Sequence, residues 1–138
     1  MRNLPASHFD GATLSRSVVA DGCRIGKGSV IDHCLIGVRS RIGNNCKLTD
    51  TVLIGADHFP SAEEEAADVK AGRPLLNVGD GTVIRNAILD KDCRIGKNVK
   101  ILNEAKHVEY DDPAGMYHVR DGIVCVPRGG TIPDGKVI

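Results

Sequence analysis

The chain has 138 residues, enough for one domain, and its 18 basic residues are balanced by 18 acidic ones. A neutral chain with 3% aromatic residues and no tryptophan lacks the basic patches and stacking platforms of nucleic-acid-binding proteins. No apolar run approaches the roughly 18 residues of a membrane span, and residues 1–10 contain no apolar signal core. The composition therefore predicts a cytoplasmic protein that binds neither nucleic acid nor a membrane.

The first half of the chain has a regular aliphatic period. Residues 1–11 are interpreted as a linker that enters a single repetitive domain at 12–138. Between residues 12 and 55 an aliphatic residue recurs at steps of five or six, so that three steps cover 17 residues. These residues are Leu14, Val19, Ile25, Ile31, Ile36, Ile42, Leu48 and Leu53. A period near six that slips by one residue every third step predicts a three-sided coil of short strands, which is a parallel β-helix.

A small residue stands two positions before each of these aliphatic residues. The set is Ala12, Ser17, Cys23, Ser29, Cys34, Ser40, Cys46 and Thr51. Residues two apart in a strand point to the same side, so each face should place one small and one large side chain in a narrow core. Since no C-x-x-C occurs, the cysteines in this register are interpreted as small buried hydrophobes, and Cys125, outside it, as more accessible.

Two segments interrupt the period and are expected to leave the coil as excursions. In the first, residues 56–77, Ser61-Ala62-Glu63-Glu64 matches a capping box and predicts a short helix that ends before Gly72. The coil then resumes over residues 78–101. The second excursion, residues 102–122, is acidic, and residues 123–138 rejoin the coil. The N-terminal edge of the coil has no obvious polar cap, which predicts that this end packs against something.

Histidines are the first candidates for chemistry, because acyltransferases and zinc carbonic anhydrases built on such coils need them. The chain has five, at positions 8, 33, 58, 107 and 118, and none is paired with another at ligand spacing. We therefore expect no metal site. A stand-alone trimeric acyltransferase that uses His33 or His58 as its base is an alternative function, and a purely structural oligomerisation module is another.

Basic residues crowd the second half of the coil and its ending. They are Arg85, Lys91, Arg94, Lys97, Lys100, Arg120 and Arg128, with acidic residues between them. Because equivalent positions on successive coil turns stack, these residues could gather into a binding patch for a phosphorylated metabolite. An ordinary solvated face of mixed charge is the other interpretation.

Several motifs resemble one family along almost the whole chain, from about residue 4 to residue 138. They are GDGTVIRNAILDKDCRIGKNV at 79–99, IGVRSRI at 36–42, IGAD at 54–57, DGIVCV at 121–126 and IPDG at 132–135. Together they resemble the C-terminal domain of ADP-glucose pyrophosphorylase, which is glucose-1-phosphate adenylyltransferase. The likeness is closer to the cyanobacterial and plant enzymes than to those of enteric bacteria.

The resemblance implies an all-β domain, a left-handed parallel β-helix, that helps to assemble a tetramer and contributes to an effector site. In the family, a separate nucleotidyltransferase domain makes ADP-glucose from ATP and glucose 1-phosphate for glycogen or starch synthesis, with Mg²⁺ as its cofactor. That catalytic domain is a partner expected to be missing from this chain. The chain alone is therefore expected to hold no catalytic residue, no cofactor and no metal.

The resemblance also places two effector-binding residues. The family's effector lysines fall on Lys91 and on Arg128, where the second position departs from the lysine of plant-type enzymes. Arginine keeps the charge but changes its geometry and hydration, which leaves the identity of the phosphorylated effector open. We expect Lys91 and Arg128 to lie close together, with Asp90 or Asp92 between them when no anion is bound.

Overall fold

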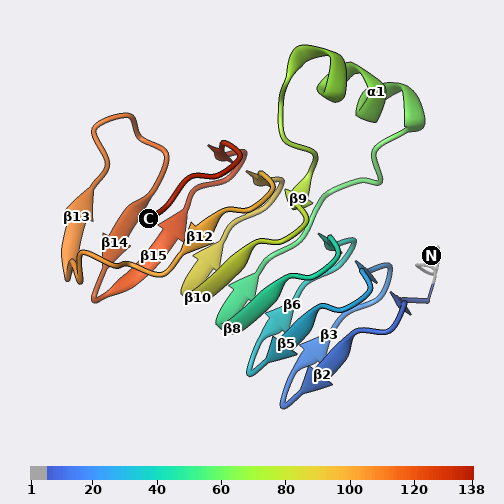
Figure 1. Cartoon of the computed structure of the whole chain (residues 1–138), viewed down its shortest axis with the longest axis horizontal. Coiled ribbons are helices and arrows are strands. Elements are labelled where there is room, and N and C mark those ends of the chain that lie inside the picture. The colour runs from blue at the N-terminus through green and yellow to red at the C-terminus, as the bar shows by residue number, and fades with distance from the viewer. Residues whose placement is uncertain (1–5) are drawn as a thin grey trace.

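The computed structural model describes residues 6–138 and consists of a three-sided coil with two excursions (Figure 1). Its elements in chain order are β1 (His8–Phe9), β2 (Thr13–Ser15), β3 (Val18–Val19), β4 (Arg24–Ile25), β5 (Val30–Asp32), β6 (Leu35–Ile36), β7 (Arg41–Ile42), β8 (Lys47–Leu53), α1 (Ala62–Ala71), β9 (Asn77–Val78), β10 (Val83–Leu89), β11 (Arg94–Ile95), β12 (Lys100–Ile101), β13 (Glu109–Asp111), β14 (His118–Arg120), β15 (Ile123–Val126) and β16 (Thr131–Ile132).

The strands of the coil pair in parallel and form three faces. The first face runs in the order β1-β4-β7-β9-β11-β16. The second contains β2, β5, β12 and the first halves of β8 and β10, and the third contains β3, β6, β15 and the second halves of β8 and β10. The two long strands bend at Asp50 and Asn86, whose positive φ angles of 49° and 55° turn the chain from one face to the next.

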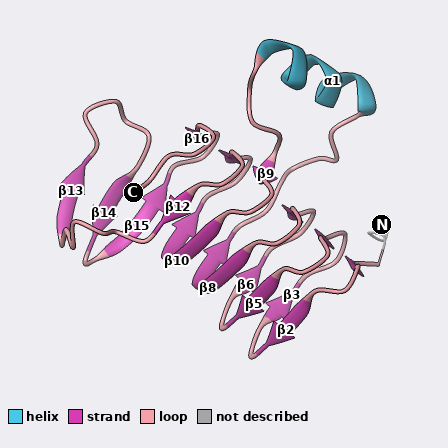
Figure 2. Cartoon of the chain, viewed as in Figure 1, coloured by secondary structure: helices cyan, strands magenta, loops and turns pink. Residues whose placement is uncertain are grey.

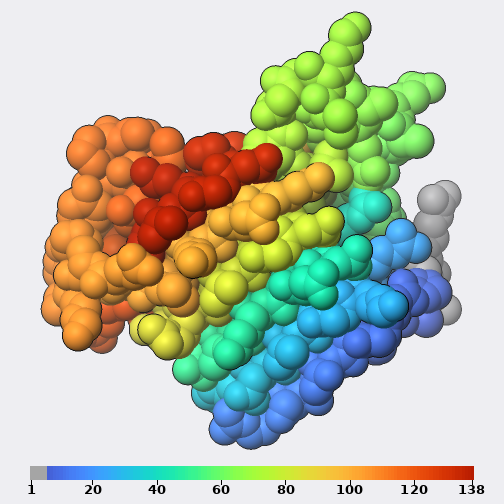
Figure 3. All heavy atoms as spheres, in the orientation of Figure 1, coloured from blue at the N-terminus to red at the C-terminus, as the bar shows by residue number. Residues whose placement is uncertain are grey.

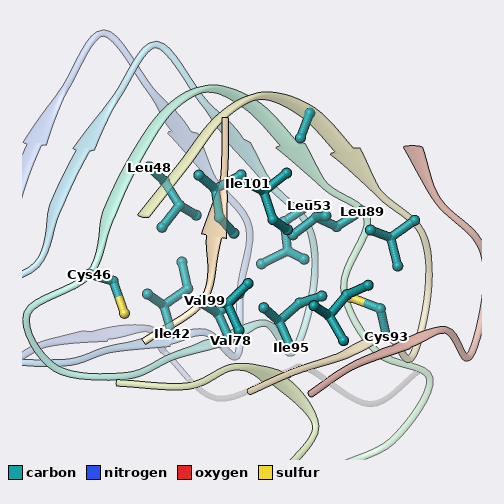
Figure 4. Packing of buried hydrophobic residues seen from close by; sticks show 14 of the residues in the cluster. Ile42, Cys46, Leu48, Leu53, Val78, Leu89, Cys93, Ile95, Val99 and Ile101 are labelled. Atoms are coloured by element: carbon teal, nitrogen blue, oxygen red, sulfur yellow. The ribbon is translucent and has the colours of Figure 1, made fainter. Parts of the chain in front are cut away.

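The interior is built from three ladders of aliphatic side chains, one for each face, as the period predicts (Figure 4). Along the first face the register aligns Ile25, Ile42, Val78, Ile95 and Ile132. The equivalent ladder of the second face contains Ile31, Leu48, Ile84 and Ile101, and that of the third face contains Ile36, Leu53, Leu89 and Val126. All of these side chains are buried, so the predicted register is confirmed.

The small residues occupy the remaining interior positions. Cys23, Cys34, Cys46 and Cys93 are buried and free, whereas Cys125 is only partly buried, as expected. Burial raises the pKa of Cys93 to about 12. A thiol that stays protonated at neutral pH is a poor nucleophile and metal ligand, so these cysteines act in packing.

The first turn of the coil lies open. Residues 1–11 were expected to be a linker, but β1 within them already pairs with β4 and belongs to the first face. No further strand covers this end in the part of the chain that the structure describes, so Leu14, expected in the core, is 37% exposed and Phe9 is 41% exposed. The N-terminal edge is therefore an unpaired, apolar end of a solenoid, which usually needs a cover.

The first excursion contains helix α1, which stands out from the side of the coil (Figures 2 and 3). The predicted capping box is present: Ser61 accepts a hydrogen bond from the Glu64 backbone, and the Glu64 carboxylate accepts one from the Ser61 backbone. Gly72 ends the helix with a left-handed φ of 72°. These local signals explain why the helix begins at Ala62 and ends at Ala71.

Charged groups attach α1 to the first face. The buried Asp68 carboxylate accepts hydrogen bonds from Arg94 at 2.5 Å and from Arg73 at 3.1 Å. Glu65 forms a second ion pair with Arg41. The helix has a weak apolar face, since Val69 is 69% exposed, and ion pairs therefore provide much of its attachment.

The second excursion contains a β-hairpin, which the sequence did not predict. Strands β13 and β14 pair in antiparallel fashion, and β14 pairs in turn with β15, so the excursion extends the third face (Figure 1). Val119 is fully buried, and Tyr117 is 9% exposed. The hairpin forms the end of the molecule opposite to the open first turn (Figure 3).

Candidate anion-binding site

The residues inferred for effector binding lie on the corner between the third and first faces. Backbone hydrogen bonds stack successive turns of this corner: the Asp92 N–H donates to Gly55 O at 3.0 Å, and the Gly129 N–H donates to Lys91 O at 2.9 Å. Lys91 and Arg128 are 37 positions apart in the sequence but belong to adjacent turns. The second excursion therefore returns the chain beside the turn that holds Lys91.

The two cations share one carboxylate, that of Asp57. Lys91 Nζ lies 3.0 Å from Asp57 Oδ1, and Arg128 Nη2 lies 2.6 Å from Asp57 Oδ2. Each oxygen of one side chain thus accepts from a different cation. The prediction that Lys91 and Arg128 lie close together is therefore confirmed.

The carboxylate between the cations is not the one that the sequence suggested. Asp90 accepts a hydrogen bond from the Lys91 backbone N–H at 2.7 Å. Asp92 Oδ1 accepts from the Asp57 backbone N–H at 3.0 Å, and its other oxygen lies 4.0 Å from Arg128. Neighbours in a turn point in different directions, so closeness in sequence misassigned the partner, and Asp57 takes the central position.

Local structure fixes the position of Asp57. Gly55 has a φ of 112°, and a Cβ added there would lie 2.2 Å from Val38 O, so only glycine fits this close approach. Ala56 is buried, and its N–H donates to Val38 O at 3.0 Å. Asp57 follows directly as the first exposed residue of the excursion, with its side chain 41% exposed.

The electrostatics of the site keep Asp57 ionised. The hydrogen bond from Lys91, together with the charges of Lys91 and Arg128, holds the pKa of the Asp57 carboxyl below its ordinary value. Two cations close together would repel, and a shared anion between them removes that cost. The arrangement is therefore suited to holding one bidentate anion.

Two of the other basic residues form ion pairs away from this site. Arg94 is paired with Asp68 under α1, and Arg120 is paired with Asp111 in the hairpin at 2.6 Å. Of the two interpretations of the basic residues, a gathered patch and an ordinary face of mixed charge, these two arginines agree with the second, because each excursion brings its own carboxylates. Arg39 lies beside the residue that precedes Asp57: its guanidinium donates to Ala56 O at 3.3 Å and lies 5.7 Å from the centre of the Phe59 ring.

Two cavities lie along the first face beside the first excursion. One, of about 260 Å³, is lined by residues that include Arg24, Arg39 and Phe59. The other, of about 670 Å³, is lined by residues that include Arg73 and Lys97. Lys91 and Arg128 line neither of these two cavities. Their side chains are 43% and 64% exposed, so the candidate anion site lies on the open surface.

Three of the histidines each lie beside a single carboxylate. His33 Nδ1 lies 2.6 Å from Asp50 Oδ1, and His58 Nε2 lies 3.4 Å from Glu64 Oε2. His118 is paired with Asp111 in the hairpin. Across residues 6–138 no group of three or more histidine, cysteine or acidic side chains is arranged to hold a metal ion.

Comparison with known proteins places the chain in a family. Residues 2–137 match the family described as "GLGC left-handed parallel beta-helix domain". The chain belongs to this left-handed β-helix family. It is also 39% identical, over 137 residues, to "Glucose-1-phosphate adenylyltransferase large subunit 1, chloroplastic/amyloplastic" of Zea mays. The aligned region is 99% of this chain but 26% of that protein, so the chain spans about a quarter of its relative's length.

The match agrees with the all-β architecture described above and gives the coil its left-handed sense. The relative is named as a large subunit, that is, as one component of an assembly. In residues 6–138 of the GLGC-type domain, no helix is both long enough and apolar enough to cross a bilayer.

Proposed function

We propose that this chain is the regulatory and assembly domain of a glucose-1-phosphate adenylyltransferase. That enzyme makes ADP-glucose and pyrophosphate from ATP and glucose 1-phosphate, and so supplies glycogen or starch synthesis. The main support is that one family match extends over residues 2–137, including both excursions. The geometry adds that Lys91 and Arg128, the positions of the family's effector lysines, contact the same carboxylate.

In this proposal a phosphorylated metabolite binds at Lys91 and Arg128. A phosphate ester would accept charge-assisted hydrogen bonds, forked from Arg128 and single from Lys91. Both cationic side chains are exposed, at 43% and 64%, and lie on an open corner that a second domain could cover. A nucleotidyltransferase catalytic domain is the proposed cover, and it would supply the remaining effector contacts and the Mg²⁺ site.

Titration of the 138-residue chain with 3-phosphoglycerate and fructose 1,6-bisphosphate at low salt tests this proposal. Without the second domain we expect weak affinity, on the order of millimolar, which corresponds to about −4 kcal/mol. Amide NMR shifts should map to Lys91 and Arg128 and disappear in Lys91→Ala. Arg85→Ala, which removes a cation on strand β10 away from the corner, is the matched control and should leave the shifts in place. Binding that survives Lys91→Ala would contradict the assignment.

We further propose that the chain alone has no adenylyltransferase activity and that it self-associates, as a component of a tetramer. Incubation with ATP, glucose 1-phosphate and Mg²⁺ should release no pyrophosphate, and light scattering should give a mass above the 14.7 kDa of one chain. The cytoplasm is the proposed location. The maize relative's name gives a plastid location, and cell fractionation that found this protein in plastids would contradict the cytoplasmic proposal.

The acyltransferase alternative has less support. It needs a histidine base beside an acyl-carrier cleft, but His33 and His58 line neither of the two cavities described above. A purely structural module is the other alternative. It predicts no saturable anion binding, so the same titration separates it from the proposed function.

A further inference from the structure

The candidate anion site already contains an anion from its own chain. Asp57 makes short contacts to both cations, and Asp92 lies within 4.0 Å of Arg128. Two positive charges are thus matched by two negative charges, and the site has no excess of positive charge to offer. An incoming anion cannot simply add to this arrangement. It must either remain at a distance or take the place of a carboxylate.

We propose that Asp57 is a built-in counter-ion that an anionic effector must displace. This competition weakens every anion alike, so that dianions, with their stronger attraction to the two cations, bind measurably and monoanions do not. The inference rests on the proposed function of Lys91 and Arg128 as an anion site. It adds to that function a residue that sets the affinity a ligand needs, Asp57, and the ligand class that meets this requirement, tetrahedral dianions such as a phosphate monoester.

Competition from Asp57 follows from its tether. The residue is attached to the buried Ala56, and its backbone N–H is held by Asp92, so its carboxylate is confined near the two cations. A group confined by a short tether acts at an effective concentration of about millimolar or higher. A free monoanion offers the cations no more charge than Asp57 does, and it also loses translational freedom. A phosphate dianion offers twice the charge and three acceptor oxygens.

Displacement is structurally feasible. The Asp57 side chain is 41% exposed, and the following residues, His58 and Phe59, are exposed as well. Rotation of the Asp57 side chain toward solvent therefore requires no opening of the core. Asp92 is a less suitable candidate for displacement, because one of its oxygens accepts the Asp57 N–H and its side chain is only 25% exposed.

Sulfate and methanesulfonate form a matched pair of probes for this selection. Both present tetrahedral sulfur oxyanions, but the first carries two charges and the second carries one. Each is titrated by NMR into the 138-residue chain at constant ionic strength. We expect the native chain to bind sulfate and to bind methanesulfonate much more weakly. In Asp57→Asn both anions should bind about tenfold more tightly, because neither must then displace a carboxylate, and methanesulfonate binding should become measurable.

Asp50→Asn is the control for removing one negative charge. Asp50 is also a partly exposed carboxylate in an ion pair, but its partner is His33 on a different corner. This variant should leave both affinities unchanged. Asp57→Ser, which removes the carboxylate and shortens the side chain, should reproduce the effect of Asp57→Asn and serves as the second variant if the asparagine chain folds poorly.

A pH titration of the Asp57 carboxyl in the native chain distinguishes displacement of Asp57 from a general effect of charge. Lys91 lowers the pKa of this carboxyl in the free chain. If sulfate displaces it, the carbon-13 titration of the Asp57 carboxyl should shift to higher pH at saturating sulfate. Sulfate binding without that shift, or with equal affinity in Asp57→Asn, would overturn the counter-ion role and leave the anion site standing. Absence of sulfate binding in the native chain and in both Asp57 variants would overturn the anion site itself.

Discussion

The two excursions leave the same coil but are attached to it by different interactions. Helix α1 is held mainly by charges, through Asp68 between two arginines and through the Arg41–Glu65 pair. The hairpin of β13 and β14 is held by strand pairing and by buried side chains, among them Val119 and Tyr117. Backbone pairing and apolar burial depend less on pH and salt than ion pairs do. The hairpin also has ion pairs, such as Arg120–Asp111, but their side chains are 51% and 65% exposed, whereas that of Asp68 is 6% exposed. The first excursion should therefore be the more readily detached part of the molecule.

A change in the core of the coil should have a larger effect on stability than a change in either excursion. Ile95 is fully buried, and its strand pairs with β9, which ends the first excursion, and with β16, which follows the second. Ile95→Ala should lower the free energy of unfolding by about 2–5 kcal/mol, through lost burial and the remaining cavity. Thermal and denaturant unfolding measure this loss. Both excursions should lose protection together.

Lys27→Ala is the control for the core variant, since Lys27 is exposed on an equivalent turn of the coil. It should change the free energy of unfolding by less than about 0.5 kcal/mol. An unchanged midpoint for Ile95→Ala would show that the ladder register is wrong.

Val119→Thr tests the hairpin. Threonine keeps the shape and the strand preference of valine but buries a hydroxyl where the side chain has 0% exposure. We expect a loss of about 1–3 kcal/mol, confined to β13, β14 and their contacts with β15. Hydrogen exchange should show faster opening of the hairpin with α1 unchanged. Val108→Thr is the matched control, because Val108 is 62% exposed and the change there should have almost no effect.

Asp68→Asn tests the helix attachment. Asparagine resembles the protonated acid and removes the charge that faces Arg73 and Arg94. Because the arginines are 57% and 30% exposed, water partly replaces the lost contacts, and we expect a loss of about 1–2 kcal/mol. Exchange should accelerate in α1 but not in the hairpin. Glu63→Gln, an exposed charge in the same helix, is the control.

Acid should act on the helix in the same way. The hydrogen bond from Arg94 lowers the pKa of Asp68 in the folded state. A carboxyl whose folded pKa lies below its unfolded value of about 3.9 contributes stability at neutral pH that is lost as pH falls through the folded pKa. NMR signals of α1 should therefore change in acid before those of the hairpin core. Simultaneous loss of both excursions would contradict the difference in attachment.

The same comparison shows which features were predictable from the sequence. The core ladders were predictable, because every coil turn repeats the same pattern of small and large residues and the repetition reveals the period. Helix α1 was also predictable, because the residues of its capping box lie within a few positions of one another. The hairpin was not predictable. Strands β13 and β14 have three residues each, too few to show alternation, and the loop 112–117 between them is longer than the two-residue turns that mark a hairpin in a sequence.

The candidate site was predictable only in part. The resemblance identified the two cations, Lys91 and Arg128, but not the carboxylate between them. Asp57 reaches Lys91 from 34 residues away, along a path that depends on the close approach at Gly55. Two sequence signals point to it: it ends the IGAD motif at 54–57, and it is the first carboxylate after the coil pattern stops. The two-residue strand β1 was missed because it is recognisable only by its pairing with β4.

The smallest expected effect concerns the local signal that predicted the helix. Ser61→Ala removes the hydroxyl that accepts the Glu64 N–H at 3.1 Å, and the cost should be about 0.5–1 kcal/mol. If ion pairs hold α1 to the coil, the helix should fray at its first turn while Asp68 keeps its contacts with both arginines. Exchange should then rise at residues 62–65 and remain slow at Asp68 and Val69, and Ser61→Asp should restore protection because aspartate is also a good cap. Uniform loss of protection along α1 would mean that capping, rather than the ion pairs, decides whether the first excursion is ordered.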